Sequence, residues 1–397
     1  MLITAVTFLT LSLLGLLAWI LVLVRARRMV RSQPTIRAGL DHAPASMPRV
    51  SVVVPAHDEA RVIDRCATSL RDQHYPDLEM IFVLDRCTDE TLDILRPHAD
   101  ADDRVTIIEN ETCPDGWAGK CNAARVGAEA ASGTYLLFTD ADTIFEPDLV
   151  RAAVGLAETR GVALLSLLST LTTDHAFERI AQPVATMTLV RMFPIDRIHR
   201  PDRPSRPFAN GQFMLFRRDV YDAIGGHGAV SDDLLEDIAF ARLVHANGGT
   251  CGAFIADGML VCSMYSSYAA FREGWKRIFI EACKRKPGRL RKNGWRSILI
   301  GIAWPVFQLG ATAVGAGLLA SLPVLGGALL AVVGVGLAIQ VWTLGYAYGL
   351  GGTPRTAIFW FPIGSVMVGR ILLEAAADLE ARRPIQWGGR AYVLEPR

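Results

Sequence analysis

The sequence has almost no net charge: 41 basic and 40 acidic residues leave a formal charge of +1 over 397 residues. This balance argues against a nucleic-acid surface, which needs an excess of Lys and Arg. None of the seven cysteines forms a Cys-x-x-Cys pair, so they are interpreted as reduced structural thiols rather than as a zinc site or a disulfide framework. The chain also lacks an internal repeat and a long low-complexity stretch.

Hydrophobic residues are in excess, at 51% of the chain, and they gather at its two ends. Residues Leu2 to Val24 carry no charge and could cross roughly 30 Å of hydrocarbon as a helix. In the alternative, a cleaved signal peptide, basic residues would precede the apolar stretch, whereas here Arg25, Arg27, Arg28 and Arg31 follow it. The positive-inside tendency then predicts an uncleaved anchor with the amino terminus outside and the following chain cytoplasmic.

Two further uncharged stretches, Ile298 to Ala320 and Val324 to Leu350, predict membrane spans near the carboxyl terminus. A third stretch, Ala357 to Ala377, contains Pro362 and Arg370 and could be a tilted span or an interfacial segment. We favour the interfacial segment, because it returns the basic tail to the cytoplasmic side.

Strands and helices alternate in the charge-balanced middle of the chain. A β-branched run over 49–55 predicts a buried strand, and apolar residues at helical spacing follow it. Residues 78–84 form a second such strand, and acidic turns at Asp58, Asp85 and Asp89 follow the two strands. This alternation predicts a parallel sheet with ligands bound beyond the carboxyl ends of its strands.

A pair of carboxylates closes a third predicted strand. Asp140-Ala141-Asp142 comes directly after the apolar run 135–138, so its hard oxygen ligands should lie at the same sheet edge. Lys120 stands at the start of the preceding helix, where it could meet a phosphate or simply cap the helix. Together these residues predict a site for a divalent cation and a diphosphate.

These motifs resemble the successive blocks of family 2 glycosyltransferases. The matching blocks are Val-Pro-Ala-His-Asp-Glu (54–59), Asp-Arg-Cys-Thr-Asp-Glu-Thr (85–91), Gly-Trp-Ala-Gly-Lys (116–120), Phe-Thr-Asp-Ala-Asp-Thr (138–143), Ala-Asn-Gly-Gln-Phe (209–213), Gly-Gly-His (225–227) and Leu-Glu-Asp-Ile-Ala (235–239). The later blocks are most similar to membrane enzymes that glycosylate lipids, notably bacterial carotenoid glycosyltransferases, with ceramide and hopanoid-associated relatives behind. The tail 386–392 resembles the Trp-Lys-Gly-Arg-x-Tyr ending common there.

Two departures from the family pattern matter. Leu84 stands where the family often has the first of two adjacent aspartates, which leaves Asp85 as the expected contact to the base. The Gln/Arg-x-x-Arg-Trp signature of processive polymer synthases is missing, and residues 272–277 only loosely echo it. A processive polysaccharide synthase is therefore disfavoured.

The resemblance implies an α/β fold: a GT-A-type nucleotide-sugar-binding domain with a mainly parallel sheet, flanked by transmembrane helices. It places Asp140 and Asp142 on Mg²⁺ or Mn²⁺ and makes Asp237 the general base, although Asp237 could also be only an acid at a helix start. The nucleotide-sugar site would comprise Pro55, Ala56, Asp58, Glu59, Asp85, Asp89, Lys120, Asp140 and Ala141. The acceptor or sugar side would comprise Gly211, Gln212, His227, Glu236, Trp275, Trp387 and Arg390. For His227, a turn residue is the alternative.

The expected division of the chain has six parts: an amino-terminal transmembrane anchor (1–24), a basic juxtamembrane linker (25–48), a GT-A catalytic domain (49–264), amphipathic interfacial helices (265–296), two or three carboxyl-terminal membrane helices (297–378), and a cytoplasmic tail with a Trp-Gly-Gly-Arg motif (379–397). Residues 193–207, rich in Pro and Arg, are expected to form a mobile loop over the active site.

The resulting hypothesis is a multi-pass enzyme of the cell (inner) membrane with a cytoplasmic catalytic domain. It would be an inverting, metal-dependent glycosyltransferase (a hexosyltransferase) that moves a sugar from a nucleotide sugar, UDP-linked by family preference, to a membrane lipid or terpenoid such as a carotenoid. Its expected partners are the donor, the lipid acceptor and the bilayer, but not nucleic acid. Transfer to polyprenyl phosphate and a catalytically silent membrane scaffold remain as alternatives.

Overall fold

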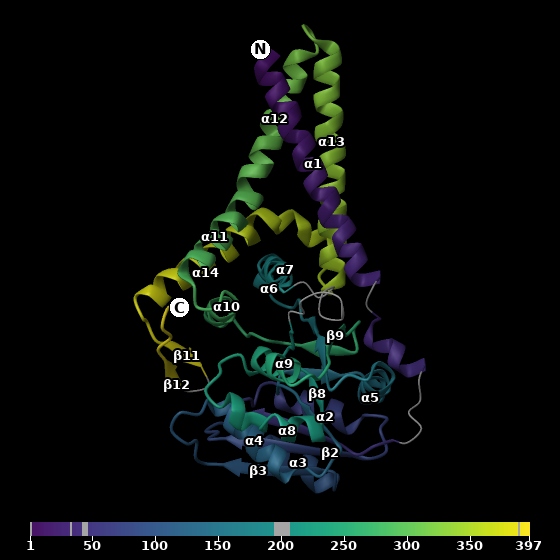
Figure 1. Ribbon diagram of the computed structural model, residues 1–397, viewed down its shortest axis with the longest axis vertical. Helices are drawn as coiled ribbons and strands as arrows, with labels where there is room; N and C mark the ends of the chain where they lie inside the picture. The colour runs from purple at the N-terminus through teal and green to yellow at the C-terminus, as the bar shows by residue number, and fades with distance from the viewer. Residues whose placement is uncertain (1, 32–33, 42–46, 194–206, 388–389) are drawn as a thin grey trace.

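The computed structural model describes residues 2–31, 34–41, 47–193, 207–387 and 390–397 (Figure 1). An α/β domain lies at one end of the long axis, and long apolar helices extend from it to the other end (Figure 1). The apolar stretches near the two ends of the sequence thus form one group of helices on one side of the domain.

A seven-stranded, mainly parallel sheet organises the α/β domain, as predicted. In spatial order its strands are β3 (Val105–Asn110), β2 (Leu78–Asp85), β1 (Val50–Ala56), β4 (Tyr135–Phe138), β8 (Met214–Arg217), β6 (Leu164–Leu168) and β9 (Cys251–Ile255). The first four strands run parallel, β8 runs antiparallel to both of its neighbours, and β6 and β9 are parallel.

Side chains of the central strands alternate between two hydrophobic cores. In β1, Val52 and Val54 face one core and Val53 faces the other, all three with no exposed surface. Successive side chains of a strand point to opposite faces, so helices on both sides must cover this sheet. The covering helices include α2 (Ile63–Arg71), α3 (Thr91–Ala101), α4 (Gly119–Ala130), α5 (Leu149–Arg160), α8 (Arg218–Ala223) and α9 (Glu236–Ala246).

A smaller sheet places a cysteine beside the paired aspartates. It consists of β5 (Thr143–Phe145), β10 (Leu260–Cys262) and β7 (Thr170–Leu171), with β10 in the middle. In the antiparallel pairing of β10 with β5, Cys262 lies opposite Thr143, directly after Asp142. The chain then returns through α6 (Ala176–Ile180) and α7 (Gln182–Met192). The loop expected over the active site lies almost entirely in 194–206, outside the described residues.

Among the described residues, four helices are long and apolar enough to cross a membrane, by length and composition. They are α1 (Leu2–Arg31), the continuous run of α11 (Pro287–Ile298), η4 (Leu299–Ala303) and α12 (Trp304–Leu318), then α13 (Pro323–Leu350), and η5 (Arg355–Trp360) with α14 (Phe361–Glu380). Helices α1, α12 and α13 run along the long axis, whereas α14 crosses beneath them next to the α/β domain (Figure 1). The interfacial position expected for this last segment stays a prediction.

Helix α1 extends through the basic cluster instead of ending at Val24. A short 3-10 helix, η1 (Ile36–Asp41), follows and packs on α5. The side chain of Ile36 has no exposed surface, and a Cβ on Gly39 would collide with the backbone carbonyl of Ala152. The segment 25–48 is therefore partly docked on the catalytic domain.

The apolar stripe of α10 (Tyr268–Ala282) packs against protein, and the interfacial position expected for residues 265–296 stays a prediction. Phe271, Trp275 and Phe279 are 0%, 3% and 0% exposed, in a cluster shared with residues of α7 and α14. The polar face bonds to α14 as well, since Lys276 Nζ lies 2.8 Å from the Asp378 carboxylate. Helical spacing showed that an apolar face exists, but α14 rather than lipid covers it.

The tail forms the two-stranded hairpin β11 (Ile385–Trp387) and β12 (Arg390–Tyr392), in which Trp387 pairs with Arg390. Its end docks at the end of α10, where the Arg397 backbone N–H donates to the Arg285 carbonyl at 2.9 Å.

Candidate active site

The acidic turns after β1 and β2 meet at the sheet edge and are bonded to each other. The Thr88 backbone N–H donates to Asp58 Oδ1 at 2.7 Å, and the Ala60 N–H donates to Asp89 Oδ2 at 3.0 Å. Asp89 also accepts from the N–H and hydroxyl of Thr91, which hold its pKa below the usual range although burial alone would raise it. Neighbouring parallel strands thus bring these predicted site residues together.

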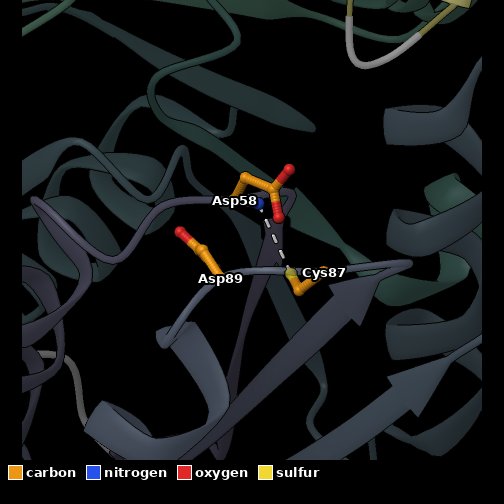
Figure 2. A group of neighbouring side chains, drawn as sticks. All are labelled: Asp58, Cys87 and Asp89. Atoms are coloured by element: carbon orange, nitrogen blue, oxygen red, sulfur yellow. Dashed lines mark hydrogen bonds between the residues drawn. The ribbon is translucent and has the colours of Figure 1, made fainter.

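Asp58, Cys87 and Asp89 form a group whose ligand atoms lie within 4.8 Å of one another, close enough to hold a metal ion (Figure 2). The Cys87 Sγ atom accepts from the Asp58 N–H and donates to the Ala56 carbonyl, both at 3.5 Å. Burial raises the pKa of this thiol, so it stays protonated at neutral pH and is a poor ligand for Mg²⁺ or Mn²⁺. We interpret the group as a structural connection that holds the two turns together.

The carboxylate of Asp85 is already bonded, contrary to its expected role as a free contact to the base. Its side chain is 4% exposed; Oδ1 accepts from Arg86 Nε at 3.1 Å and from Asn110 Nδ2 at 3.0 Å, and Oδ2 accepts from Arg86 Nη2 at 2.6 Å. The half-buried Arg86 guanidinium, which the sequence motifs did not single out, therefore pairs with Asp85. Its only sequence signal is its position directly after Asp85.

Lys120 joins the donor-side and acceptor-side acids. Its Nζ lies 2.7 Å from Asp140 Oδ1 and 2.7 Å from Glu236 Oε1. Burial alone would lower the pKa of Lys120, but attraction to these two carboxylates raises it well above its usual value, so the ammonium stays charged. Lys120 thus forms an ion-paired bridge from the end of β4 to the start of α9, and its contact with phosphate stays a prediction.

Asp142 and Asp140, the carboxylates expected to hold a divalent cation, have electrostatics that would suit one. Burial, followed by the charge of Asp140, raises the pKa of Asp142 to about 7, and Cys262 donates its thiol hydrogen to Asp142 Oδ1 at 3.3 Å. A cation between the two carboxylates would remove their mutual repulsion and favour the charged form of Asp142. Ala141 between them is 3% exposed and packs in the core, so only its backbone could contact a ligand.

Glu59 belongs to the same electrostatic environment. Burial raises its pKa to about 8, with further contributions from Asp142, Asp140, Asp89 and Asp58. This surplus of negative charge would repel a phosphate group if no cation were bound. It suits a site that uses a divalent cation to receive a diphosphate.

Asp237 is held at the start of α9 by two backbone donors. The Ile238 N–H donates to Oδ1 at 2.6 Å and the Gly211 N–H to Oδ2 at 2.9 Å. Burial, with Glu236 adjacent, nevertheless raises the pKa of Asp237 to about 7. In Glu236 itself burial acts in the same upward direction, but Lys120 outweighs it and lowers the pKa. One acid is thus fixed as an anion and the other is poised to exchange a proton near neutral pH.

Gly211 must be small because the charged groups converge on it. A Cβ there would lie 3.0 Å from Lys120 Nζ, 3.3 Å from Glu236 Oε1 and 3.7 Å from Asp237 Oδ2. The adjacent Gln212 is 5% exposed, and its side-chain oxygen accepts from Ser169 Oγ and, at 3.1 Å, from Asn210 Nδ2. Gly211 therefore shapes the site, and Gln212 fixes the loop behind it.

Two predicted acceptor-side residues are core residues. His227 is 2% exposed, packs edge-on against Phe138 and Phe240, and has Nδ1 2.7 Å from the Tyr221 hydroxyl. Burial lowers its pKa to about 3, so its ring is neutral. Its predicted contact with phosphate or acceptor is therefore wrong, as is a ligand-facing position for Trp275 beneath α14. Trp387 and Arg390 are placed only by their backbone, in the hairpin.

Residues 51–225 match the model of the family Glycosyl transferase family 2. An uncharacterized glycosyltransferase of Haemophilus influenzae is 34% identical over 111 residues, covering 28% of this chain and 33% of that protein. The putative teichuronic acid biosynthesis glycosyltransferase TuaG of Bacillus subtilis is 34% identical over 101 residues, covering 25% of this chain and 38% of that protein. The chain thus spans well under half the length of these curated relatives.

Among solved structures, the mannosyltransferase PcManGT from Pyrobaculum calidifontis, in complex with GDP-Man and Mn²⁺, aligns with 95% of this chain and 98% of its own. The TM-score is 0.51 at 22% identity, a likeness of fold. These matches support a glycosyltransferase: residues 51–225 match the family 2 model, and the α/β domain has a fold like that of PcManGT.

Proposed function

We propose that the protein transfers one sugar from a nucleotide sugar, UDP-linked by family preference, to a hydroxyl of a membrane lipid such as a carotenoid-like terpenoid. The observation that carries this proposal is the Lys120 bridge, with Nζ 2.7 Å from both Asp140 and Glu236. It joins the paired carboxylates of a donor site to the Glu236–Asp237 pair of an acceptor site. A catalytically silent scaffold would not need to keep these opposed charges together in a partly buried site.

Asp140 and Asp142 would hold Mg²⁺ or Mn²⁺, which would neutralise charge growing on the departing diphosphate. The raised pKa of Asp142 supports this role, since burial and the charge of Asp140 outweigh the attraction of Lys120, and a bound cation would stabilise the carboxylate further. PcManGT, of similar fold, was solved with GDP-Man and Mn²⁺. Asp58, Glu59 and Asp89 would line the nucleotide side, together with the Arg86–Asp85 pair.

Asp237 would act as the general base. In a single displacement the acceptor oxygen forms a bond to the anomeric carbon, the bond from that carbon to the diphosphate breaks, and the acceptor proton passes to Asp237. The configuration at the anomeric carbon is therefore inverted. A pKa of about 7 suits this task, because near neutral pH about half of the carboxyl groups are deprotonated and are still basic enough to accept the proton.

The membrane placement rests on the four candidate spans and their flanking charges. Arg25, Arg27, Arg28 and Arg31 at the end of α1 favour a catalytic domain on the cytoplasmic side of the inner membrane. In this arrangement residues 49–264 form the catalytic unit. Helices α10 and α14 then lie between it and the bilayer, where a lipid acceptor must enter.

The test is nucleotide release by the full-length protein in vesicles of native lipid extract, with a panel of UDP- and GDP-sugars and added Mn²⁺. We expect release with one donor, loss with EDTA, and one new labelled glycolipid. No release with any donor would overturn the proposal and favour the scaffold. Full turnover of Asp237→Asn with polyprenyl phosphate as acceptor would favour transfer to a lipid phosphate, which is already an anion and needs no base.

A further inference from the structure

A cavity of about 510 Å³ lies between α10, η4 and α14, at the junction of the α/β domain and the long helices. Most of its wall is apolar and consists of Ile302, Ile363, Val366, Met367 and Ile371. Its size is within the range of about 300 to 1,000 Å³ that is usual for small-molecule sites. No residue assigned above to the donor or acceptor acids lines it.

The mouth of the cavity opens on the part of the surface that the bilayer would cover. Ile302 and Ile363, one on each wall, are 43% and 48% exposed, and Leu299 beside them on η4 is 56% exposed. Both walls belong to candidate membrane spans, Pro287–Leu318 and Arg355–Glu380. Hydrocarbon rather than water would therefore meet this opening.

Charged and polar groups of α10 and α14 also line the cavity. Arg272 Nε lies 2.7 Å from Glu374 Oε2, and Tyr268 and Arg370 complete this part of the lining. Within the described part of the chain, Arg370 has no ion-pair partner. Side chains of this kind beside an apolar cavity fit a ligand that has one polar end and one hydrocarbon end.

The polar wall is also close to the donor acids along the chain. Tyr268 comes six residues after Cys262, whose thiol donates to Asp142 Oδ1 at 3.3 Å. Six extended residues reach at most about 22 Å. A lipid with its polar end at Tyr268 thus lies within one short segment of the candidate metal site.

We propose that this cavity holds the hydrocarbon chain of the lipid acceptor, with the polar end of the lipid at Tyr268, Arg272 and Arg370. This inference rests on the proposed function and adds where the acceptor enters. The π-helical turn η4 widens the wall next to Ile302, a distortion often found at functional sites. Selectivity for the chain then depends on the apolar side chains of η4 and α14.

The test uses a photoreactive diazirine analogue of a long-chain isoprenoid alcohol, incorporated into phosphatidylethanolamine–phosphatidylglycerol vesicles with the full-length protein. Met367→Trp fills the cavity from α14, and Ile302→Trp fills it from the other wall. Val306→Trp is the matched control, because Val306 lies in the same span as Ile302, is 61% exposed and does not line the cavity. Labelled residues are mapped by mass spectrometry.

We expect labelling on η4 and the middle of α14, lost in both filling variants and kept in the control. In transfer assays with native lipid extract, the filling variants should raise the apparent KM for lipid about tenfold or more while donor hydrolysis in water stays unchanged. Labelling spread evenly over α12 and α13, or full competition by bulk phospholipid, would overturn the inference. Labelling is measured without donor, so it tests the cavity independently of catalysis. If the label is specific for the cavity but the protein turns over no donor, the proposed function is refuted and the lipid site is not.

Discussion

Asp237→Asn is the sharpest test of the catalytic assignment, because the substitution preserves volume and removes only the basic carboxylate. Both carboxylate oxygens accept a backbone N–H, from Ile238 and Gly211. Asparagine can accept only one of these, and its NH₂ group then opposes the other N–H, at a cost of about 1–3 kcal/mol in stability. Loss of the base should lower kcat by about 10²- to 10⁴-fold, or about 3–5 kcal/mol in the barrier.

The assay follows nucleotide release between pH 5.5 and 9 at saturating donor and lipid. Because the pKa of Asp237 is raised to about 7, the base is protonated below that pH, and the wild-type rate should rise through pH 7 and then level off. In Asp237→Asn the remaining rate should lose this rise, while KM for the donor stays unchanged. Asp232→Asn, an exposed charge in the same loop, is the control and should behave as wild type. A variant within threefold of wild type, or a wild-type rate flat across this range, would refute the assignment.

Four further predictions address the rest of the site and the topology. Burial raises the pKa of Glu59 to about 8 and of Asp142 to about 7, so the folded protein keeps protons that the unfolded chain releases above about pH 4. Calorimetry without metal should therefore show the stability of the fold falling as the pH rises from about 4 to about 8. Added Mn²⁺ should restore this stability, and no effect of Mn²⁺ would mean that these acids bind no metal. Gly211→Ala should lower kcat about 10- to 100-fold, because the added methyl group displaces Lys120. The melting temperature should stay unchanged, which excludes unfolding as the cause. Turnover equal to wild type would contradict the close approach of the charged groups to Gly211. His227→Ala should destabilise the fold by about 2–4 kcal/mol in thermal unfolding and leave donor KM unaltered, whereas a selective rise in donor KM would return the histidine to the site. Reporter fusions at the carboxyl terminus should be active in the cytoplasm, and a periplasmic signal would mean that α14 crosses the membrane.

The central sheet and the donor edge could be predicted because their signals are local. A strand buried on both faces reads as a continuous apolar run, as in β1, and parallel strands place the following acids at one edge. Asp58, Asp89 and Asp140 were located in this way. The helix start considered for Asp237 is also found, since α9 begins at Glu236.

The remaining features depend on contacts between distant segments. No residue near Lys120 in the sequence indicates that it pairs with Glu236, and none near Asp142 indicates its hydrogen bond with Cys262. Periodicity identified the apolar face of α10 but could not say that α14 covers it. His227 follows two glycines, as turn residues often do, yet Tyr221 and the surrounding rings place it in the core.

In the proposed membrane arrangement, the short helix η1 limits how far the catalytic domain can stand from the bilayer. Only four residues separate the end of α1 at Arg31 from Ile36, which is seated under α5, and Thr35 forms a β-bridge with Ile255 of the edge strand β9. Helices α10 and α11 form a second connection between the domain and the candidate spans, so in the proposed arrangement the domain is tied to the membrane at two points. The distance from the bilayer to Asp237 should therefore select the acceptor. A lipid should be glycosylated fastest when its polar spacer places the acceptor group at this distance, and longer or shorter spacers on the same lipid should react more slowly.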